Sequence, residues 1–299
     1  MKVRYHCRRK RLPSLFIVLF VFVLPFTVLS ATDKTDSFRN ELKDRFPELH
    51  YEGRSPAVLL IHGFGGSPMD MKPLADELRK NGTAFNAIIL PGHGTTPEDL
   101  ENIVMKEWLY ASFSAYDEMK KHYDEVYIVG FSMGGSLALC VAGERDVNKI
   151  VLLSPYFSVK EKWYYFGSPE EWALRFDDII QFIQKPKTGQ INDPAGLQKY
   201  TAYEYLPLKT ISELSKLGEF AKEKAKNVRS ETLWIHSTGD IVADFDMSKR
   251  VFDSIPSKKK HFQKYEKSNH IILYDYDSED AIRRIVSFLG GDLLNRDTN

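Results

Sequence analysis

Val126-Tyr-Ile-Val-Gly130-Phe131-Ser132-Met133-Gly134-Gly135 is the stretch that decides the fold. A β-branched apolar run leads into a Gly-x-Ser-x-Gly pentapeptide, and the residues 136–142 that follow have helical character. In a strand–turn–helix unit, the serine of this pentapeptide adopts strained backbone angles, and no side chain fits at the two flanking glycines. The pattern therefore indicates that Ser132 is a nucleophile. The alternative is a glycine-rich β–α turn with an incidental serine.

A serine hydroxyl needs a base, and an acid that orients the base, before it reacts at neutral pH. In folds with this turn the chain order is serine, then aspartate or glutamate, then histidine. Asp240 follows the strand-like residues 232–236, and His270 follows the strand-like residues 262–265. Because the carboxyl ends of parallel strands meet at one edge of a sheet, both residues are predicted to join Ser132 in a catalytic triad.

A glycine-rich turn upstream predicts an oxyanion hole. The apolar run 57–61, typical of a strand buried on both faces, ends in His62-Gly63-Phe64-Gly65-Gly66. Such a turn lets backbone N–H groups point at an oxygen that gains negative charge. The predicted donors are the N–H groups of Phe64 and of Met133, the residue after the nucleophile. Taken alone, His62-Gly63 is also typical of an ordinary strand end.

These motifs together resemble the α/β-hydrolase superfamily, and within it the small bacterial carboxylesterases and monoacylglycerol lipases. The resemblance covers about residues 55 to 290 and also includes Pro91-Gly-His-Gly94, Gly239-Asp240 and Ser268-Asn-His270. It implies a Ser–Asp–His esterase that needs no cofactor. It also implies a helical cap inserted after the strand that follows the nucleophile helix.

The order of the predicted elements indicates an α/β fold, with a mostly parallel sheet and helices on both faces. Strands are expected over 57–62, 84–90, 126–130, 149–154, 232–237 and 260–265. Helices are expected over 70–81, 107–122, 134–144, 245–254 and 279–289. No cluster of histidine, cysteine and carboxylate has the spacing of a zinc site, and no nucleotide-binding glycine pattern is present, so neither a metal nor a cofactor is predicted.

The alternation of strands and helices stops between residues 155 and 229, too long an interval for a loop. We expect a helical cap there, between a first part of the core (31–154) and a second part (230–299). The cap is rich in aromatic residues and ends in an amphipathic stretch, 211–228. The aromatic side chains either line an acyl pocket or pack the cap on the core. The aromatic residues are Trp163, Tyr164, Tyr165, Phe166, Trp172, Phe176, Phe182, Tyr200, Tyr203 and Tyr205.

Residues 1–30 have the organisation of a secretory signal peptide: six basic residues and no acidic one, an apolar run over 15–24, and Val28-Leu-Ser30 before Ala31. The protein is therefore expected to be exported; the alternative is an uncleaved N-terminal membrane anchor. The chain has 41 basic and 41 acidic residues, so removal of these 30 residues leaves 35 against 41, a net charge of −6. No basic field for nucleic acid remains.

Four other residues have features of functional groups but are assigned structural roles. His93 precedes the nucleophile, which is the wrong order for the base, and is expected to support an active-site loop. His236 lies within a strand, in the core or behind the site. Asp244 stands just before a helix and is expected to cap it. Cys140 lies among apolar residues and is expected to pack in the core.

Three classes of function remain open. The first is hydrolysis of short-to-medium acyl esters or monoacylglycerols through an acyl-enzyme on Ser132. The second is a serine aminopeptidase or acyltransferase, because fold and triad do not choose the acyl donor or acceptor. The third is a non-catalytic binding protein on the same scaffold, which the complete set of predicted catalytic groups disfavours. Acyl chain length and oligomeric state do not follow from the sequence.

Overall fold

A computed structural model of the chain describes residues 50–51, 54–158, 181–184 and 189–290. Its centre is a twisted sheet that has seven strands in this part of the chain, in the order β1-β3-β2-β4-β5-β8-β9. Six strands are parallel: β2 (Arg54–Ile61), β3 (Thr83–Ile88), β4 (Val126–Phe131), β5 (Lys149–Leu153), β8 (Glu231–Ser237) and β9 (Lys260–Tyr265). At one edge β1 (His50–Tyr51) pairs antiparallel with β3.

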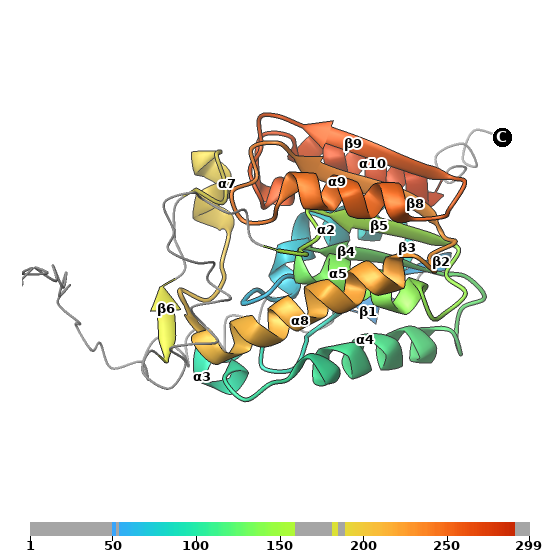
Figure 1. Ribbon diagram of the computed structural model, residues 1–299. Helices are drawn as coiled ribbons and strands as arrows, with labels where there is room; N and C mark the ends of the chain where they lie inside the picture. The colour runs from blue at the N-terminus through green and yellow to red at the C-terminus, as the bar shows by residue number, and fades with distance from the viewer. Residues whose placement is uncertain (1–49, 52–53, 159–180, 185–188, 291–299) are drawn as a thin grey trace, which may run out of the picture.

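Helices cover both faces of the sheet (Figure 1). One face is covered by α4 (Met105–Met119), α5 (Met133–Ala142), α8 (Leu208–Ala225) and α9 (Phe245–Ser254). The other face is covered by α2 (Lys72–Lys80) and α10 (Ser278–Gly290), with the 3-10 turns η1 (Pro68–Met71) and η2 (Ile272–Tyr274). The predicted α/β fold is confirmed, and each of the six predicted strands coincides with a parallel strand to within about three residues at either end.

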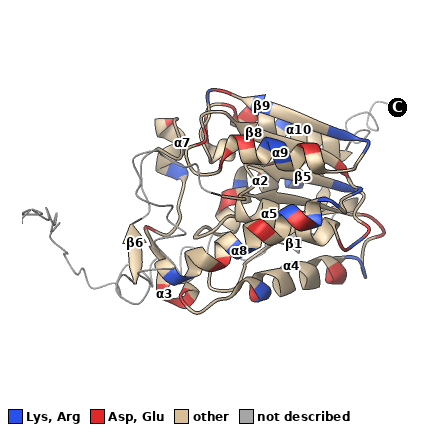
Figure 2. Cartoon of the chain, in the orientation of Figure 1, with Lys and Arg blue, Asp and Glu red and all other residues tan. Residues whose placement is uncertain are grey.

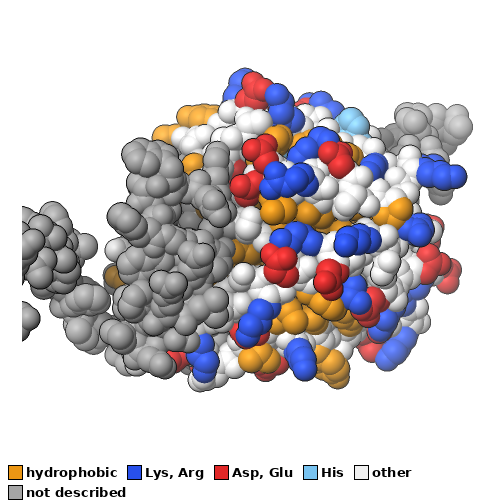
Figure 3. Space-filling view, viewed as in Figure 1, with side chains coloured by type: hydrophobic (Ala, Val, Ile, Leu, Met, Phe, Trp, Pro, Cys, Tyr) orange, Lys and Arg blue, Asp and Glu red, His pale blue; other side chains and the backbone are white. Residues whose placement is uncertain are grey.

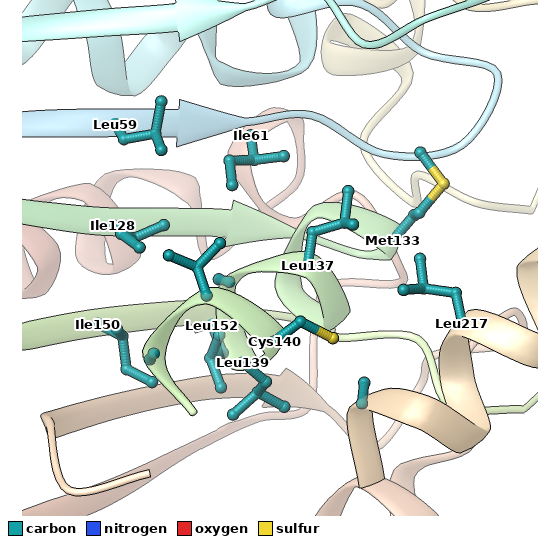
Figure 4. Close-up of a cluster of buried hydrophobic side chains, with 14 of the residues drawn as sticks. Leu59, Ile61, Ile128, Met133, Leu137, Leu139, Cys140, Ile150, Leu152 and Leu217 are labelled. Atoms are coloured by element: carbon teal, nitrogen blue, oxygen red, sulfur yellow. The ribbon is translucent and has the colours of Figure 1, made fainter. Parts of the chain in front are cut away.

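The alternation of side chains along each strand fills a core on both sides. In β2, Leu59 and Ile61 point toward α5, whereas Val58 and Leu60 point toward α2 and α10. Every residue of β4 is buried, as expected of a central strand with helices on both faces. Cys140 lies in this core beside Leu137, Leu139 and Leu217 (Figure 4), and burial raises the pKa of its thiol. The prediction that Cys140 packs in the core is confirmed.

The chain between β5 and β8 contains, in this order among the described residues, β6 (Phe182–Gln184), α7 (Pro194–Lys199), β7 (Tyr205–Pro207) and α8. The strands β6 and β7 pair antiparallel. The predicted amphipathic stretch is α8, which buries its apolar face, including Leu217 and Ala221, against α5. Six of the predicted cap aromatics, at positions 163–166, 172 and 176, lie outside the described residues. We refer to residues 189–207 as the cap segment.

Charged side chains of both signs lie on outer helices such as α8 and α9 (Figure 2). On the face shown in Figure 3 they intermingle without forming a field of one sign. In the described ranges, none of the helices combines the length and the apolar character required to cross a membrane. The predicted signal peptide or anchor, residues 1–30, lies outside those ranges.

Candidate active site

Ser132 occupies the turn between β4 and α5, with φ 52° and ψ −116°. The turn is tight because the helix begins directly beside the strand. A Cβ at Gly130 would lie 2.1 Å from the Gly134 carbonyl oxygen, and a Cβ at Gly134 would lie 2.1 Å from the Ile61 carbonyl oxygen. Both distances are far below van der Waals contact, so only glycine fits at either position. The predicted strained serine between two obligatory glycines is present.

The structure brings the three predicted triad residues together at the carboxyl edge of the sheet. Ser132 Oγ lies 3.0 Å from His270 Nε2, and His270 Nδ1 lies 2.8 Å from Asp240 Oδ2. Asp240 is completely buried, whereas Ser132 and His270 expose 6% and 4% of their surface. A carboxylate only accepts, so His270 donates through Nδ1–H and its Nε2 is left to accept the serine proton. This arrangement can activate Ser132 as a nucleophile.

Asp240 is held as an anion by four donors. Its Oδ1 accepts from the N–H groups of Val242 and Ala243, at 2.8 and 2.9 Å. Its Oδ2 accepts from His270 and also from His236 Nε2, at 3.0 Å. Burial by itself raises the pKa of the carboxyl group, but the neighbouring His270 and the hydrogen bonds from His236 and His270 outweigh it, and the pKa lies well below its usual range.

The loop that carries His270 is fixed by two polar side chains that sequence reasoning missed. Asn269 Oδ1 accepts from the N–H of His270 and from that of Ile241, so it joins the acid loop to the base loop. The buried carboxylate of Asp275 accepts from the N–H groups of Asn269, Asn192 and Asp193. It therefore ties the base loop to the cap segment.

The predicted oxyanion turn lies against the nucleophile, since a Cβ at Gly63 would be 3.3 Å from Ser132 Cβ. The Gly63 N–H donates to Asp70 Oδ2 at 3.0 Å, and the Gly65 N–H donates to His93 Nε2 at 3.0 Å. The Phe64 N–H between them has no acceptor among the described residues. The Met133 N–H stands at the start of α5, the positive end of the helix dipole.

His62 fixes the peptide plane that carries the Phe64 N–H. His62 Nδ1 lies 2.8 Å from the Gly63 carbonyl oxygen, and its Nε2 accepts from the Leu90 N–H at 3.1 Å. The two partners require a neutral ring with the proton on Nδ1. Complete burial, only partly offset by the hydrogen bond to Gly63, lowers the pKa of His62 to about 4. Because C=O and N–H point in opposite directions in a trans peptide, holding the Gly63 oxygen also orients the Phe64 N–H.

The expectations for the other polar residues are met. His93 supports the predicted oxyanion turn through Gly65, and Asp244 caps α9 through a 2.6 Å bond from the Met247 N–H to its Oδ1. His236 lies behind the acid. Asp70, Asn269 and Asp275 are the supporting residues that were not predicted. Within the part of the chain that the structure describes, no three His, Cys, Asp or Glu side chains gather in the manner of metal ligands.

The sequence profile of the family described as serine aminopeptidase, S33, matches residues 54–277 of this chain. That is about three-quarters of its length. The chain belongs to this family. The matched residues include the turn at Ser132 and the loops of Asp240 and His270.

Curated relatives of this S33 family member are named as lipases and esterases. The thermostable monoacylglycerol lipase of Bacillus sp. (strain H-257) is 28% identical over 232 residues, which are 77% of this chain and 89% of the relative. The carboxylesterase of Bacillus subtilis (strain 168) is 21% identical over 241 residues, covering 80% of this chain and 94% of the relative.

Solved structures agree on the fold. A structure from work on the metagenome-derived lipolytic enzymes LipS and LipT superposes with a TM-score of 0.73, at 24% identity, covering 80% of this chain and 95% of the other. The monoacylglycerol lipase of Paleococcus ferrophilus gives a TM-score of 0.65 at 20% identity, covering 78% and 93%. The S33 family member therefore has the α/β-hydrolase fold.

Proposed function

We propose that this protein is a serine carboxylic ester hydrolase that acts on short-to-medium acyl esters, including monoacylglycerols, through an acyl-enzyme on Ser132. One observation carries the proposal: the continuous hydrogen-bonded relay from Ser132 through His270 to Asp240. The names of the relatives from the two Bacillus strains support the choice of esters. The proposal assigns the catalytic roles to Ser132, Asp240 and His270, and the oxyanion donors to Phe64 and Met133.

In the first half of the reaction, Ser132 Oγ attacks the ester carbonyl carbon while His270 Nε2 takes the hydroxyl proton. The tetrahedral intermediate carries its negative charge on the former carbonyl oxygen. The N–H groups of Phe64 and Met133 would bind this oxygen, since both are available beside the nucleophile. His270 then returns the proton to the departing alcohol, and the acyl group remains on Ser132.

In the second half, water replaces the alcohol. His270 removes a proton from the water, whose oxygen attacks the acyl carbon, and the same two N–H groups bind the second oxyanion. Collapse of this intermediate releases the carboxylic acid, and the proton on His270 returns to Ser132. Asp240 remains ionised throughout and stabilises the positive charge that His270 carries in each half.

The family description and the names of the relatives point to different bonds, an amide in the first case and an ester in the second. Esters are the easier target, because an alkoxide leaves without the full protonation that an amine requires from His270. The proposed cap over the site would enclose a pocket rather than present a flat surface to a lipid emulsion. The hydrogen bonds of the cap segment to both Gly65 and Asp275 support this arrangement.

The direct test compares turnover on p-nitrophenyl butyrate, monolaurin, triolein and proline p-nitroanilide. We expect activity on the first two and little or none on the last two. Ser132→Ala and His270→Ala should each lower ester turnover by roughly 10⁴-fold or more without loss of fold, and Ser132→Ala should abolish labelling by a fluorophosphonate. A clear preference for triolein or for the amide would contradict the proposed substrate. Wild-type protein that resists the fluorophosphonate would indicate a binding protein.

We also propose that residues 1–30 are a signal peptide and that the mature chain begins at Ala31. The basic stretch, the apolar run and the Val28/Ser30 pair support this proposal. N-terminal sequencing of the native protein tests it. Protein that begins at Met1 and is recovered only from membranes would favour the alternative of an uncleaved anchor.

A further inference from the structure

A second histidine contacts the carboxylate of Asp240. His236, the sixth residue of β8, is completely buried, and its Nε2 lies 3.0 Å from Asp240 Oδ2. The same oxygen accepts from His270 Nδ1 at 2.8 Å. On the far side of its ring, His236 Nδ1 lies 2.7 Å from Ser248 Oγ, and Trp234 Nε1 donates to that hydroxyl at 2.9 Å. A chain of four hydrogen bonds thus runs from Trp234 to His270.

The chemistry of the partners constrains the protons in this chain. The indole N–H of Trp234 can only donate, so Ser248 Oγ accepts from it and its own hydroxyl proton is free to donate to His236 Nδ1. At the other end, an ionised carboxylate can only accept, so His236 carries its proton on Nε2. Both requirements are met by one neutral form of the ring. Helix α9, which contributes Ser248, is thereby connected to the acid of the site.

We propose that His236 is a positioning residue: its Nε2–H holds Asp240 Oδ2 in the place where this oxygen receives the Nδ1–H of His270. The inference rests on the proposed function. The two backbone donors to Oδ1 fix one end of the carboxylate, and His236 fixes the other end. Among the described residues, His236 and His270 are the titratable side chains that contact Asp240.

The position of Asp240 Oδ2 matters because the buried carboxylate must remain charged while the proton on Ser132 moves to His270. A hydrogen bond from a neutral donor stabilises a buried anion without adding a second positive charge next to the imidazolium. Without His236, Oδ2 of the fully buried Asp240 would lose one of its two partners. The two backbone donors would still hold Oδ1, but Oδ2 would be held by His270 alone and would no longer fix the position of that ring.

The experiment compares wild-type protein with His236→Met, which fills the space without a donor, and His236→Gln, whose amide N–H can reach Asp240 Oδ2. His261→Gln, at an exposed histidine of β9, is the matched control. For p-nitrophenyl butyrate we expect His236→Met to lower kcat roughly 10- to 100-fold with little change in KM. His236→Gln should recover most of that loss. A His236→Met enzyme with wild-type kcat, or a His236→Gln enzyme as impaired as His236→Met, would overturn the proposal.

A second measurement does not depend on activity or on the folding of a variant. In ¹⁵N-histidine-labelled wild-type protein, His236 is expected to show a protonated Nε2 and a bare Nδ1 at neutral pH. A proton on Nδ1 with a bare Nε2 would refute the hydrogen bond to Asp240. Failure of the proposed function gives a different result, because the wild-type protein would then not hydrolyse the ester more rapidly than Ser132→Ala.

Discussion

Acidification should destabilise this protein through His62, the residue behind the proposed oxyanion turn. The ring is completely buried and makes two hydrogen bonds that only the neutral form with the proton on Nδ1 can make. Protonation would place an N–H at Nε2 against the N–H of Leu90. It would also leave an imidazolium without a counter-ion in a site removed from water. The native state therefore resists a proton that the unfolded chain accepts readily.

The size of the effect follows from the two pKa values. Burial lowers the pKa of His62 from 6.5 to about 4. Between these values the unfolded state binds more protons than the native state, so the free energy of unfolding decreases as the pH falls. The contribution of His62 is complete above about pH 6.5 and disappears as the pH approaches 4. At ~1.4 kcal/mol per pKa unit, lowering the pH from about 7.5 to about 4.5 removes about 2.5 kcal/mol.

Urea unfolding followed by the fluorescence of the buried Trp108 and Trp234 measures this loss. Other groups also titrate in this range, so the matched variant is His62→Asn, which keeps a donor near the Gly63 oxygen but cannot take up a proton. The difference in unfolding free energy between the two proteins should shrink by about 2.5 kcal/mol between about pH 7.5 and about pH 4.5. Parallel curves for the two proteins would refute the reasoning, because His62 would then titrate alike in both states.

Three further predictions concern the site. Gly134→Ala should lower the free energy of unfolding, measured by chemical denaturation, by roughly 3 kcal/mol or more, or prevent folding, because its Cβ would meet the Ile61 carbonyl oxygen at 2.1 Å. The control is Gly82→Ala, at φ 68° but with open space around the Cβ, which should lower it by only about 1–2 kcal/mol. His93→Phe, which removes the acceptor for the Gly65 N–H, should lower kcat on p-nitrophenyl butyrate roughly 10-fold, and His93→Gln should restore part of it; equal activity of wild type and His93→Phe would argue against this role. Asp240→Asn should lower kcat by roughly 10⁴-fold, because its amide N–H₂ would face two ring N–H groups and force His270 into the wrong tautomer. Asp244→Asn, which can still cap α9, is the control. A larger loss of kcat in Asp244→Asn than in Asp240→Asn would show that the acid is misassigned.

The sequence predicts the fold best where an apolar, strand-like run is followed by a loop that carries a motif. The apolar run at 126–130 predicted a central strand, and every residue of β4 is buried. The pentapeptide predicted that no side chain fits at Gly130 or Gly134, and the structure shows the backbone atoms that a Cβ would meet there. The same logic located Asp240 and His270, because each follows a strand whose carboxyl end must lie at the same sheet edge. Ser132, Asp240 and His270 are far apart in the chain, so their contacts follow from topology and not from local sequence.

Other parts of the structure could not be predicted, because the sequence contains no pattern that marks them. The strands β1, β6 and β7 contain two or three residues each, which is too short for any periodicity to appear. Asp275 and Asn269 act through backbone N–H groups, which any residue type provides, so no spacing marks their partners. The sequence places His236 four residues before Asp240. Its proposed role also depends on the hydroxyl of Ser248 in α9, a contact that no spacing in the sequence marks.

The cap segment connects the loop of His270 to the glycine-rich turn at Phe64, two parts of the chain that lie far apart in the sequence. Its Gln190 carbonyl accepts from the N–H of Ile271, next to His270, while its Tyr203 N–H donates to the Gly65 carbonyl, next to Phe64. The Tyr203 ring stacks on His93, the residue that holds the Gly65 N–H. The sequence left packing and substrate binding as alternatives for the aromatic residues of the cap. Tyr203 packs, but it packs on the residue that supports the proposed oxyanion turn. A displacement of the cap segment would move the base and the proposed oxyanion donor together, so changes in it should alter kcat as well as KM.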